Sequence, residues 1–455
     1  CEAYPAEAIA MAIASAGYAS QLFLEQSPLK LQLLDNFGVI LVADHLSGFF
    51  ILTNALVTAA VVFYCWQSGK TAFFYTQTII LHGSVNAAFI CADFISLYVA
   101  LEVISIAAFL LIAYPRTDRS IWVALRYLFV SNTAMLFYLV GAVLVYQANH
   151  SFAFEGLRTA PPEALALIFL GLLVKGGIFV SGLWLPLTHS ESETPVSALL
   201  SGVVVKTGVF PLVRCALIIE EIDPIIRIFG VGTALLGVGY AVFEKDTKRM
   251  LAFHTISQLG FVLAAPTVGG FYAMAHGLVK SALFLIAGVL PSRNLKELQH
   301  QPINTSIWIA LAMASFSISG FPLLSGFGAK VLTMKNLLPW QVIGMNVAAL
   351  GTAISFAKFI FLPHGDGKPE KVKPGFWLAM ILLIGGLIAA NGVYYKAYTF
   401  ANIVKPLATI GLGWLAYFWV FKKSVLKLPR VIEEFEHLIG VMSLMLILLF
   451  WMVFA

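Results

Sequence analysis

Four lysines lie inside segments of the chain that are otherwise apolar. They are Lys175 in LLVKGGIFVSG, Lys206 in SGVVVKTGVF, Lys280 in HGLVKSALFLIAG and Lys330 in SGFGAKVLTM. Glu102, in SLYVALEVISIAAFLLIAY, is a fifth charge of this kind. An ionised side chain near the middle of a bilayer costs at least ~2.5–3.5 kcal/mol, so such residues usually face the protein interior and mark ion pathways. The set therefore predicts proton or ion translocation.

The residue types suit proton transfer. Burial disfavours the charged form of a lysine, whereas a nearby carboxylate favours it. A lysine whose carboxylate partner can move is therefore a switchable proton carrier. Glu102 is the natural partner, most directly for Lys175. Small neighbours such as Gly176, Gly177 and Gly208 allow close approach of helices and leave space for water.

Two histidines extend this set. His276 precedes Lys280 by four residues, so both project from one helix face, and His254 lies in LAFHTISQLG. Because imidazole titrates near neutral pH, both are predicted to relay protons. The alternative is a histidine that is hydrogen-bonded for structural reasons alone. Lys335 and Lys358 fit lysines that extend to the membrane interface, and they are left out of the pathway.

The composition indicates a membrane protein. Of 455 residues, 60% are hydrophobic and 11% charged, whereas a soluble domain is about 45–50% apolar and about 25% charged. A helix of about 20 apolar residues spans the hydrocarbon core. The sequence therefore predicts an all-α polytopic membrane protein with about 14–15 transmembrane helices and no soluble domain. The expected helices cover residues 7–24, 42–66, 73–94, 96–114, 121–147, 164–187, 195–219, 224–243, 248–267, 270–290, 304–330, 338–362, 376–396, 404–421 and 437–455.

The loops between these helices alternate in charge. The basic set comprises Lys70, Arg116, Arg119, Lys245, Lys248, Arg249, Arg293, Lys296, Lys368, Lys371, Lys373, Lys422, Lys423, Lys427 and Arg430. The opposite set is poorer in basic residues. Because basic loops stay in the cytoplasm, the basic set is predicted to be cytoplasmic, in a protein that crosses the inner (plasma) membrane many times.

Other classes of function lack support. The positive residues lie in short loops, so the net charge of +5 does not indicate a nucleic-acid partner. The four cysteines show no CxxC or Cys/His ligand spacing, so neither a metal site nor a disulfide framework is predicted. No cofactor site is predicted either.

Two of the apolar segments are interrupted. Pro186 and Pro195 bracket a polar stretch in LPLTHSESETPVSALL, and Pro322 precedes Lys330 in SGFPLLSGFGAK. Proline removes a backbone hydrogen bond, and within lipid the freed carbonyls must be satisfied by protein or water. Broken helices in matching positions of two halves are typical of inverted-repeat transporters.

The ordered motifs ADHLSGFF, LYVALEVISI, HSESETPVSALLSGVVVK, KDTKRMLAFHTISQLG, HGLVKSALFLIAG and SGFPLLSGFGAK resemble a known family. They resemble the antiporter-like subunits shared by Mrp-type multisubunit cation/proton antiporters, respiratory complex I and membrane-bound hydrogenases. The resemblance covers roughly residues 40–335. Within this group the chain is most similar to the D subunit of Mrp antiporters.

The resemblance implies two inverted five-helix repeats, each with a broken helix. We expect them at 73–219 and 220–362, between N-terminal helices at 1–72 and C-terminal helices at 363–455 that include a cytoplasmic basic and acidic segment. It also implies that a further helix precedes residue 1. By matching motif, Glu102 pairs with Lys175, Lys206 leads towards the centre, His276 and Lys280 form the central relay, and Lys330 belongs to the second broken helix. Two departures are Glu193, an added charge at the first break, and His254, which stands where the family commonly has serine.

The leading hypothesis is a proton-translocating subunit of a multisubunit cation/proton antiporter, with no catalytic chemistry of its own. The alternative is a proton-pumping membrane subunit of a complex I-like or hydrogenase redox complex. A third reading is a scaffold subunit that does not transport. The expected partners are other membrane subunits, the lipid bilayer and protons, with Na⁺ or K⁺ as the candidate exchanged cation.

Overall fold

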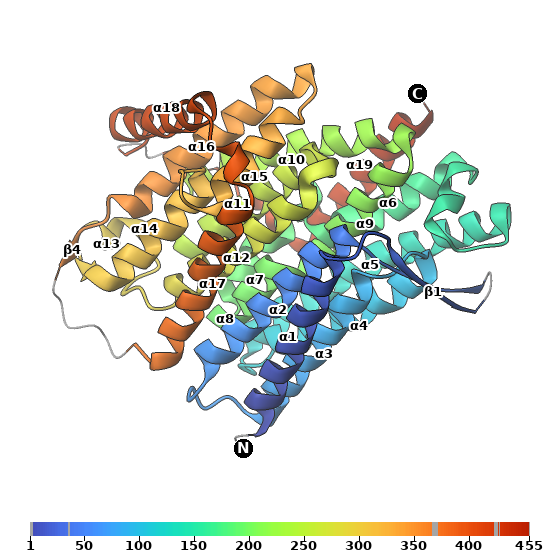
Figure 1. Cartoon of the computed structure of the whole chain (residues 1–455), viewed down its shortest axis with the longest axis horizontal. Coiled ribbons are helices and arrows are strands. Elements are labelled where there is room, and N and C mark those ends of the chain that lie inside the picture. Colours follow the sequence, from blue (N-terminus) through green and yellow to red (C-terminus); the bar gives the residue numbers. More distant parts are fainter. Residues whose placement is uncertain (1–2, 35–36, 366–371, 423–425, 427, 455) are drawn as a thin grey trace.

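A computed structural model of the chain describes residues 3–34, 37–365, 372–422, 426 and 428–454. The fold is almost entirely helical, with the helices bundled side by side (Figure 1). Within the described residues, eleven helical stretches are long and apolar enough to cross a membrane. The predicted fold class, an all-α polytopic membrane protein, is confirmed.

The helices are ordered along the chain as follows. The first nine are α1 (Ala3–Leu22), α2 (His45–Cys65), α3 (Ala72–Ala88), α4 (Phe94–Ile112), α5 (Asp118–Asn149), α6 (Pro162–Gly176), α7 (Leu185–Glu191), α8 (Thr194–Leu199) and α9 (Lys206–Ile218). The next ten are α10 (Asp223–Phe243), α11 (Thr247–Ala264), α12 (Gly269–Ala287), α13 (Leu295–Leu298), α14 (Thr305–Ser319), α15 (Ser325–Lys335), α16 (Val342–Ile360), α17 (Pro374–Val393), α18 (Phe400–Ala416) and α19 (Phe435–Phe454). The strands are β1 (Leu29–Leu34), β2 (Gly38–Ala43), β3 (Ile303–Asn304) and β4 (His364–Gly365).

Each apolar segment that the sequence analysis assigns to a span coincides with one of these helices or with a broken pair. The predicted spans outside the eleven stretches correspond to α1, α3, α11 and the pair α14 and α15, which are shorter or less apolar. Asp93 caps the start of α4, because its carboxylate accepts a hydrogen bond from the backbone N–H of Ser96 at 2.7 Å. Such a cap satisfies one of the unpaired donors at a helix N-terminus.

One element was not predicted. β1 and β2 form an antiparallel hairpin that connects α1 to α2, with Leu29 opposite Ala43. The side chains of β1 are exposed along its whole length, whereas β2 lies against the bundle. Asp93 also accepts a hydrogen bond from the backbone N–H of Ile40 at 2.8 Å, so the cap of α4 holds the hairpin in place.

Both predicted helix breaks are present. α6 ends at Gly177 and α14 ends at Gly320, and each glycine has a positive φ, 67° and 87° respectively. Glycine adopts this left-handed conformation at no steric cost, which makes it a common helix terminator. Residues Phe179–Trp184 then lead into α7, and residues 321–324 lead into α15. In the predicted repeats, each broken helix is the fourth of five, after α3, α4 and α5 in the first and after α10, α11 and α12 in the second.

The position of the first break differs from the prediction. Pro186 lies in the first turn of α7, and Pro195 lies in the first turn of α8. Proline is well tolerated there, because the first N–H groups of a helix have no partner within the helix. The helix instead stops at Gly177, directly after Lys175, so the break is next to the charged residue.

Helices α8, α9, α11 and α12 form the centre of the molecule. The side chains of α12 are buried along its whole length, from Gly269 to Ala287. Residues Leu200–Val204 connect α8 to α9 as a wider, π-helical turn. At the C-terminal end, α18 packs on α16 whereas α19 packs on α6, and the two helices lie far apart in Figure 1.

The basic loops meet on one surface, which we call the basic face. Its contacts are Lys70 with Glu193 (2.6 Å), Arg119 with Glu191 (3.5 Å), Arg293 with Asp246 (2.8 Å), Arg430 with Glu244 (3.2 Å) and the Lys373 ammonium with the Gln67 carbonyl (2.9 Å). The loops therefore lie together as their charge pattern predicts, and their cytoplasmic location stays a prediction. Lys368, Lys371, Lys423 and Lys427 lie outside the described residues.

Candidate functional site

Lys175 lies at the end of α6, beside the break, and is buried. Its ammonium donates hydrogen bonds to the Leu101 carbonyl at 3.1 Å, to the Ser131 hydroxyl at 2.8 Å and to the Ser105 hydroxyl. We call these three acceptors, from α4 and α5, the hydroxyl cradle. Since an ammonium has three N–H donors, the cradle satisfies it fully.

The expected pair between Lys175 and Glu102 is open in this structure, because their charged groups are not within the 4.0 Å of an ion pair. The Oε1 atom of Glu102 is buried without a hydrogen-bond partner. Glu102 lies on the same face of α4 as Val99 and Ile106, whose side chains are 56% and 53% exposed. The two charges are still close enough to act on each other electrostatically.

Lys206 begins α9 directly after the π-helical turn and is fully buried. Its ammonium donates to the Ser201 carbonyl, five residues earlier, at 3.1 Å. Its side chain passes close to Gly277 of α12, where an added Cβ atom would lie 3.4 Å from the Lys206 Cε atom. π-helical turns are often found at functional sites, and this one directs Lys206 towards the helix that carries His276.

His276 and Lys280 occupy one side of α12, as their spacing predicts. The Lys280 ammonium donates to the Leu251 carbonyl of α11 and lies 5.0 Å from the centre of the Phe284 ring. His254 of α11 lies against Phe356, with ring centres 4.7 Å apart. Both ring nitrogens of His254 and of His276 are buried without a hydrogen-bond partner. Among the described residues, no protein group therefore hydrogen-bonds to either ring, and the relay role of the two histidines stays a prediction.

Lys330 lies on α15, after the second break, and its ammonium has no hydrogen-bond partner in the part of the chain that the structure describes. It lies 5.5 Å from the centre of the Phe261 ring. The hydroxyls near the break are also buried and unpaired: Ser315, Ser317, Ser319 and Ser325. A cavity of about 10 Å³ connects this region to His276 and is lined by Gln258, Tyr272 and Ser317 among others. A cavity of that size holds about one water molecule.

The structure brings some of the predicted residues together and not others. Lys206, His276, Lys280 and His254 lie close enough for their charges to act on one another. The field of Lys330 reaches His254. Glu102 and Lys175 act on each other electrostatically, and Lys175 is directed towards α4 and α5.

His189 was not identified from the sequence. It lies on α7, is fully buried, and neither ring nitrogen has a hydrogen-bond partner. Its ring stacks on Phe284 at 4.8 Å, and Lys280 contacts the same ring. In the sequence, this histidine is the first residue of the polar stretch HSESET, which is typical of a loop.

Lys358 lies on α16. Its ammonium donates to the carbonyls of Ala241, Val242 and Glu244 at 3.2, 2.7 and 3.0 Å. It therefore caps the C-terminal end of α10, and its reach to the membrane interface stays a prediction. A cation at this end of a helix is favourable because the carbonyl groups there are unpaired.

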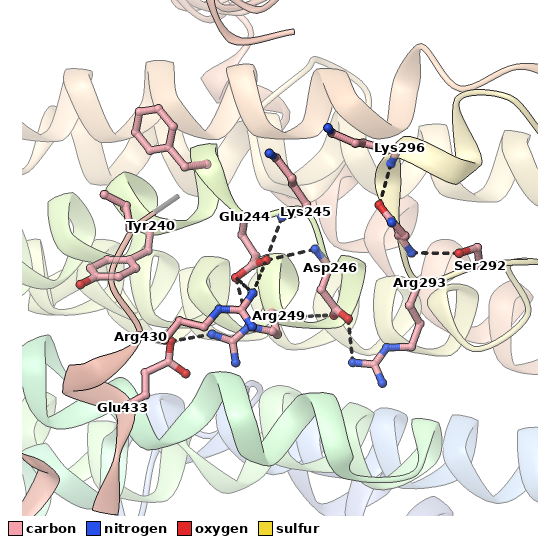
Figure 2. Close-up of a pocket in the computed structure, with 13 residues that line it drawn as sticks. Tyr240, Glu244, Lys245, Asp246, Arg249, Ser292, Arg293, Lys296, Arg430 and Glu433 are labelled. Atoms are coloured by element: carbon pink, nitrogen blue, oxygen red, sulfur yellow. Dashed lines mark hydrogen bonds and ion pairs between the residues drawn. The ribbon is translucent and has the colours of Figure 1, made fainter. Parts of the chain in front are cut away.

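A cavity of about 780 Å³ opens on the basic face between the end of α10, the residues after α12 and the segment before α19 (Figure 2). Glu244 lies at its centre and accepts hydrogen bonds from the backbone N–H groups of Lys245 and Asp246 and from the Arg249 side chain. Burial alone would raise the pKa of Glu244, but these bonds and the charge of Arg249 outweigh it. The pKa is therefore lowered from the ordinary value of 4.5.

Glu433 connects the C-terminal segment to both halves of the molecule. Its carboxylate pairs with Arg249 of α11 at 2.5 Å, and its backbone carbonyl accepts a hydrogen bond from Arg126 of α5. Arg430, three residues earlier, pairs with Glu244 (Figure 2). We call these five residues the C-terminal clamp. Two of its members, Arg430 and Glu433, lie just before α19 in the sequence.

Known proteins with similar sequences belong to two kinds of membrane complex. The chain is 29% identical over 384 residues to the D subunit of the Na(+)/H(+) antiporter of Alkalihalophilus pseudofirmus, and the match covers 76% of this chain and 78% of the relative. It is also 29% identical over 432 residues to the N subunit of the NADH-quinone oxidoreductase of Desulforudis audaxviator, covering 83% and 85% of the two chains.

Two solved structures share the fold. A chain of the membrane-bound sulfane sulfur reductase, an archaeal respiratory membrane complex, superimposes with a TM-score of 0.76 at 20% identity, over 91% of this chain and 93% of that one. A chain of the Mrp complex from a Dietzia species superimposes with a TM-score of 0.71 at 20% identity, over 96% and 93%. Residues 91–355, more than half of the sequence, match the family described as NADH:quinone oxidoreductase/Mrp antiporter, transmembrane. The chain therefore belongs to the NADH:quinone oxidoreductase/Mrp antiporter family of membrane proteins.

Proposed function

We propose that this chain is the proton-translocating subunit of a multisubunit cation/proton antiporter. The observation that carries the proposal is the burial of four lysines in the helical interior, of which only Lys175 has a carboxylate, Glu102, near it within the described residues. Buried charges without a partner are costly, and inside a membrane they are found mainly where they serve transport.

The proposed path runs from Glu102 and Lys175 to Lys206, then to His276 and Lys280, and on to Lys330, with His254 beside its second half. At each step a proton leaves an ammonium or imidazolium and is taken up by the neutral amine or imidazole of the next residue. Like charges in a low-dielectric interior repel strongly, so protonation of one site promotes release from its neighbour. Their titrations are therefore coupled.

The partners follow from the relatives. A Na(+)/H(+) antiporter among the relatives and a Mrp complex among the shared folds support an assembly of membrane subunits that exchanges Na⁺ or K⁺ for protons. We place the assembly in the plasma membrane with the basic face towards the cytoplasm. A second candidate is a proton-pumping subunit of a redox complex, which the NADH-quinone oxidoreductase relative and the sulfane sulfur reductase fold favour.

Replacing Lys280 tests the function. Membrane vesicles that contain the complete complex are acidified inside, and the loss of the pH gradient is followed after addition of Na⁺ or K⁺. We expect Lys280→Ala to abolish this exchange, because the central proton carrier is gone. Lys335→Ala, which removes an exposed lysine of α15, should retain it. Normal exchange in Lys280→Ala would refute the proposal.

Purification of the complex separates the two candidates. Small membrane subunits without iron or flavin would support the antiporter. Iron–sulfur proteins that co-purify would instead identify the membrane arm of a redox machine.

A further inference from the structure

We propose that the hydroxyl cradle is a second binding position for the Lys175 side chain, which competes with Glu102 for its ammonium and allows Lys175 to release its proton. The inference rests on the proposed function and adds Ser105 and Ser131 to it as positioning residues. Neither residue was singled out by the sequence, because single serines in apolar helices carry no pattern.

The geometry of the cradle shows that it is complete. All three N–H donors of the Lys175 ammonium are taken up by the Leu101 carbonyl and the two serine hydroxyls. Ser105 also donates to the Leu101 carbonyl at 2.9 Å, and the two hydroxyl oxygens lie 3.2 Å apart. No donor of Lys175 is left for Glu102, whose Oε1 atom stays unpaired. The lysine therefore binds either the cradle or the carboxylate.

The two binding positions differ in the charge state that they favour. A carboxylate accepts hydrogen bonds and carries a negative charge, so it stabilises the ammonium form alone. A hydroxyl both donates and accepts. Ser131 can accept a hydrogen bond from the ammonium and, after rotation of its O–H group, donate one to the lone pair of a neutral amine. The cradle thus accommodates Lys175 before and after proton release, which Glu102 does not.

The charges around Lys175 are consistent with a two-way competition. The elements around Lys175 are α5, α9 and α19, which pack on α6, together with α4 and α7. Their titratable groups are Tyr98 and Glu102 on α4, Asp118, Arg119, Arg126, Tyr127, Tyr138 and Tyr146 on α5, His189 and Glu191 on α7, Lys206, Arg214 and Cys215 on α9, and Glu436 and His437 on α19. Glu102 is the charge whose field acts on Lys175. Moving the ammonium from the carboxylate to neutral hydroxyls therefore removes the interaction that most favours its charge.

The test removes the serine hydroxyls in two backgrounds. With Glu102 present, Ser105→Ala/Ser131→Ala leaves the carboxylate as the remaining strong acceptor. Lys175 then holds its proton more tightly. When the rate of cation/proton exchange is plotted against pH, the rising limb of the curve, where the rate increases with pH, therefore moves to higher pH. With Glu102→Gln, the same two substitutions leave the ammonium with neutral acceptors only, chiefly the Leu101 carbonyl, and without the two hydroxyls, so the pH at which exchange rises moves to lower values. A hydrogen bond to a charged group changes the pKa of that group by about one unit. We therefore expect the rising limb to shift by about 1 pH unit in each background.

The decisive result is that the serine substitutions shift the exchange profile in opposite directions with Glu102 and with Glu102→Gln. A purely structural role of the serines would lower activity at every pH without moving the limb, and this outcome would overturn the inference. Ser105→Thr and Ser131→Thr, which keep the hydroxyl, should keep the wild-type profile. Ser84→Ala, which removes an exposed hydroxyl bond on α3, serves as the matched control.

A second readout avoids dependence on transport. Infrared difference spectra of the purified complex follow the carboxylate band of Glu102, which should shift in Ser105→Ala/Ser131→Ala as Lys175 moves onto it. An unchanged band would refute the competition even if transport were lost. Normal ion exchange in Lys280→Ala would instead refute the proposed function itself, so the two failures are distinguishable.

Discussion

At the scale of single residues, the lysines in the described interior of the bundle differ from the paired cations near the surface in forming no ion pair with a carboxylate. Near the surface, cations are paired: the guanidinium of Arg214 binds the Asp44 carboxylate through two hydrogen bonds of 2.8 and 2.9 Å. Within the described part of the bundle, Lys206 and Lys280 each donate to a backbone carbonyl, and Lys330 has no acceptor. The contrast separates residues that hold the fold from residues that the proposed function uses.

The pair of Asp44 and Arg214 leads to a prediction about stability and pH. Burial alone would raise the pKa of Asp44, but Arg214 and Ser47 outweigh it, and the pKa is lowered from 3.8. Because the folded state holds the carboxylate in its charged form, this contribution is present above pH 3.8 and is lost as the pH falls through the lower folded-state pKa. We expect Asp44→Asn to reduce stability by about 2 kcal/mol at neutral pH.

Thermal unfolding in detergent, followed from neutral pH down to about pH 3, measures this effect. The difference in melting temperature between the wild type and Asp44→Asn should shrink on acidification. A difference that is constant with pH would mean that Asp44 stabilises α2 only by its shape and its neutral hydrogen bonds.

At the scale of elements, α6, which carries Lys175, and α9, which carries Lys206, touch through their backbones. A Cβ atom at Gly208 would collide with the backbone nitrogen of Gly176 and would lie 2.7 Å from the Leu172 carbonyl oxygen. Neither contact is with a flexible side chain, so the helices would have to move apart. The glycines are therefore needed for the close approach of the two helices.

Gly208→Ala should destabilise the protein by about 1–3 kcal/mol through overpacking, and it should also reduce ion exchange. The matched control is Gly239→Ala on α10, where an added Cβ atom meets nothing within 4 Å. There, alanine should stabilise the helix by about 0.5–1 kcal/mol. Melting temperatures of the two variants in detergent test the prediction, and equal effects would contradict it.

The sequence predicted the helices better than it predicted their interruptions. A run of about 20 apolar residues has few alternatives to a membrane helix, so every assigned segment was found. The break after Lys175 was missed because it depends on Gly177, and glycine is common within membrane helices. The hairpin was missed because β1 and β2 are short, with six residues each. At the site, misplaced charges were visible from sequence, whereas Ser105, Ser131 and His189 required the packing of distant helices.

At the scale of the whole molecule, the C-terminal clamp fastens one half to the other. Glu433 pairs with Arg249 of the second predicted repeat and accepts a hydrogen bond from Arg126 of the first. The helix that follows, α19, packs on α6, which carries Lys175. α19 thus packs on the helix that carries Lys175, although the two helices are far apart in sequence.

Glu433→Gln should weaken this attachment. Removing one partner of a buried ion pair leaves the other charge uncompensated and typically costs about 3–5 kcal/mol. We expect limited proteolysis to release a fragment that contains α19 at least tenfold faster than in the wild type, as roughly expected from such an energy. Glu436→Gln, which changes an exposed carboxylate, should leave the rate unchanged. An unaltered rate in Glu433→Gln would show that α19 is held by its apolar face alone.

The complete enclosure of α12 has a consequence for how the protein is made. A helix that carries Lys280 and His276 gains little from lipid, and every one of its side chains is covered by neighbouring helices. It is therefore poorly suited to leaving the translocon as an isolated span, since each central lysine opposes insertion by at least ~2.5–3.5 kcal/mol. Of the helices that pack on it, α2, α8 and α11 precede it in the sequence, and they have to be near when it enters the bilayer. Biogenesis of this chain thus depends on retaining early helices at the insertion site until the middle of the sequence has been synthesised.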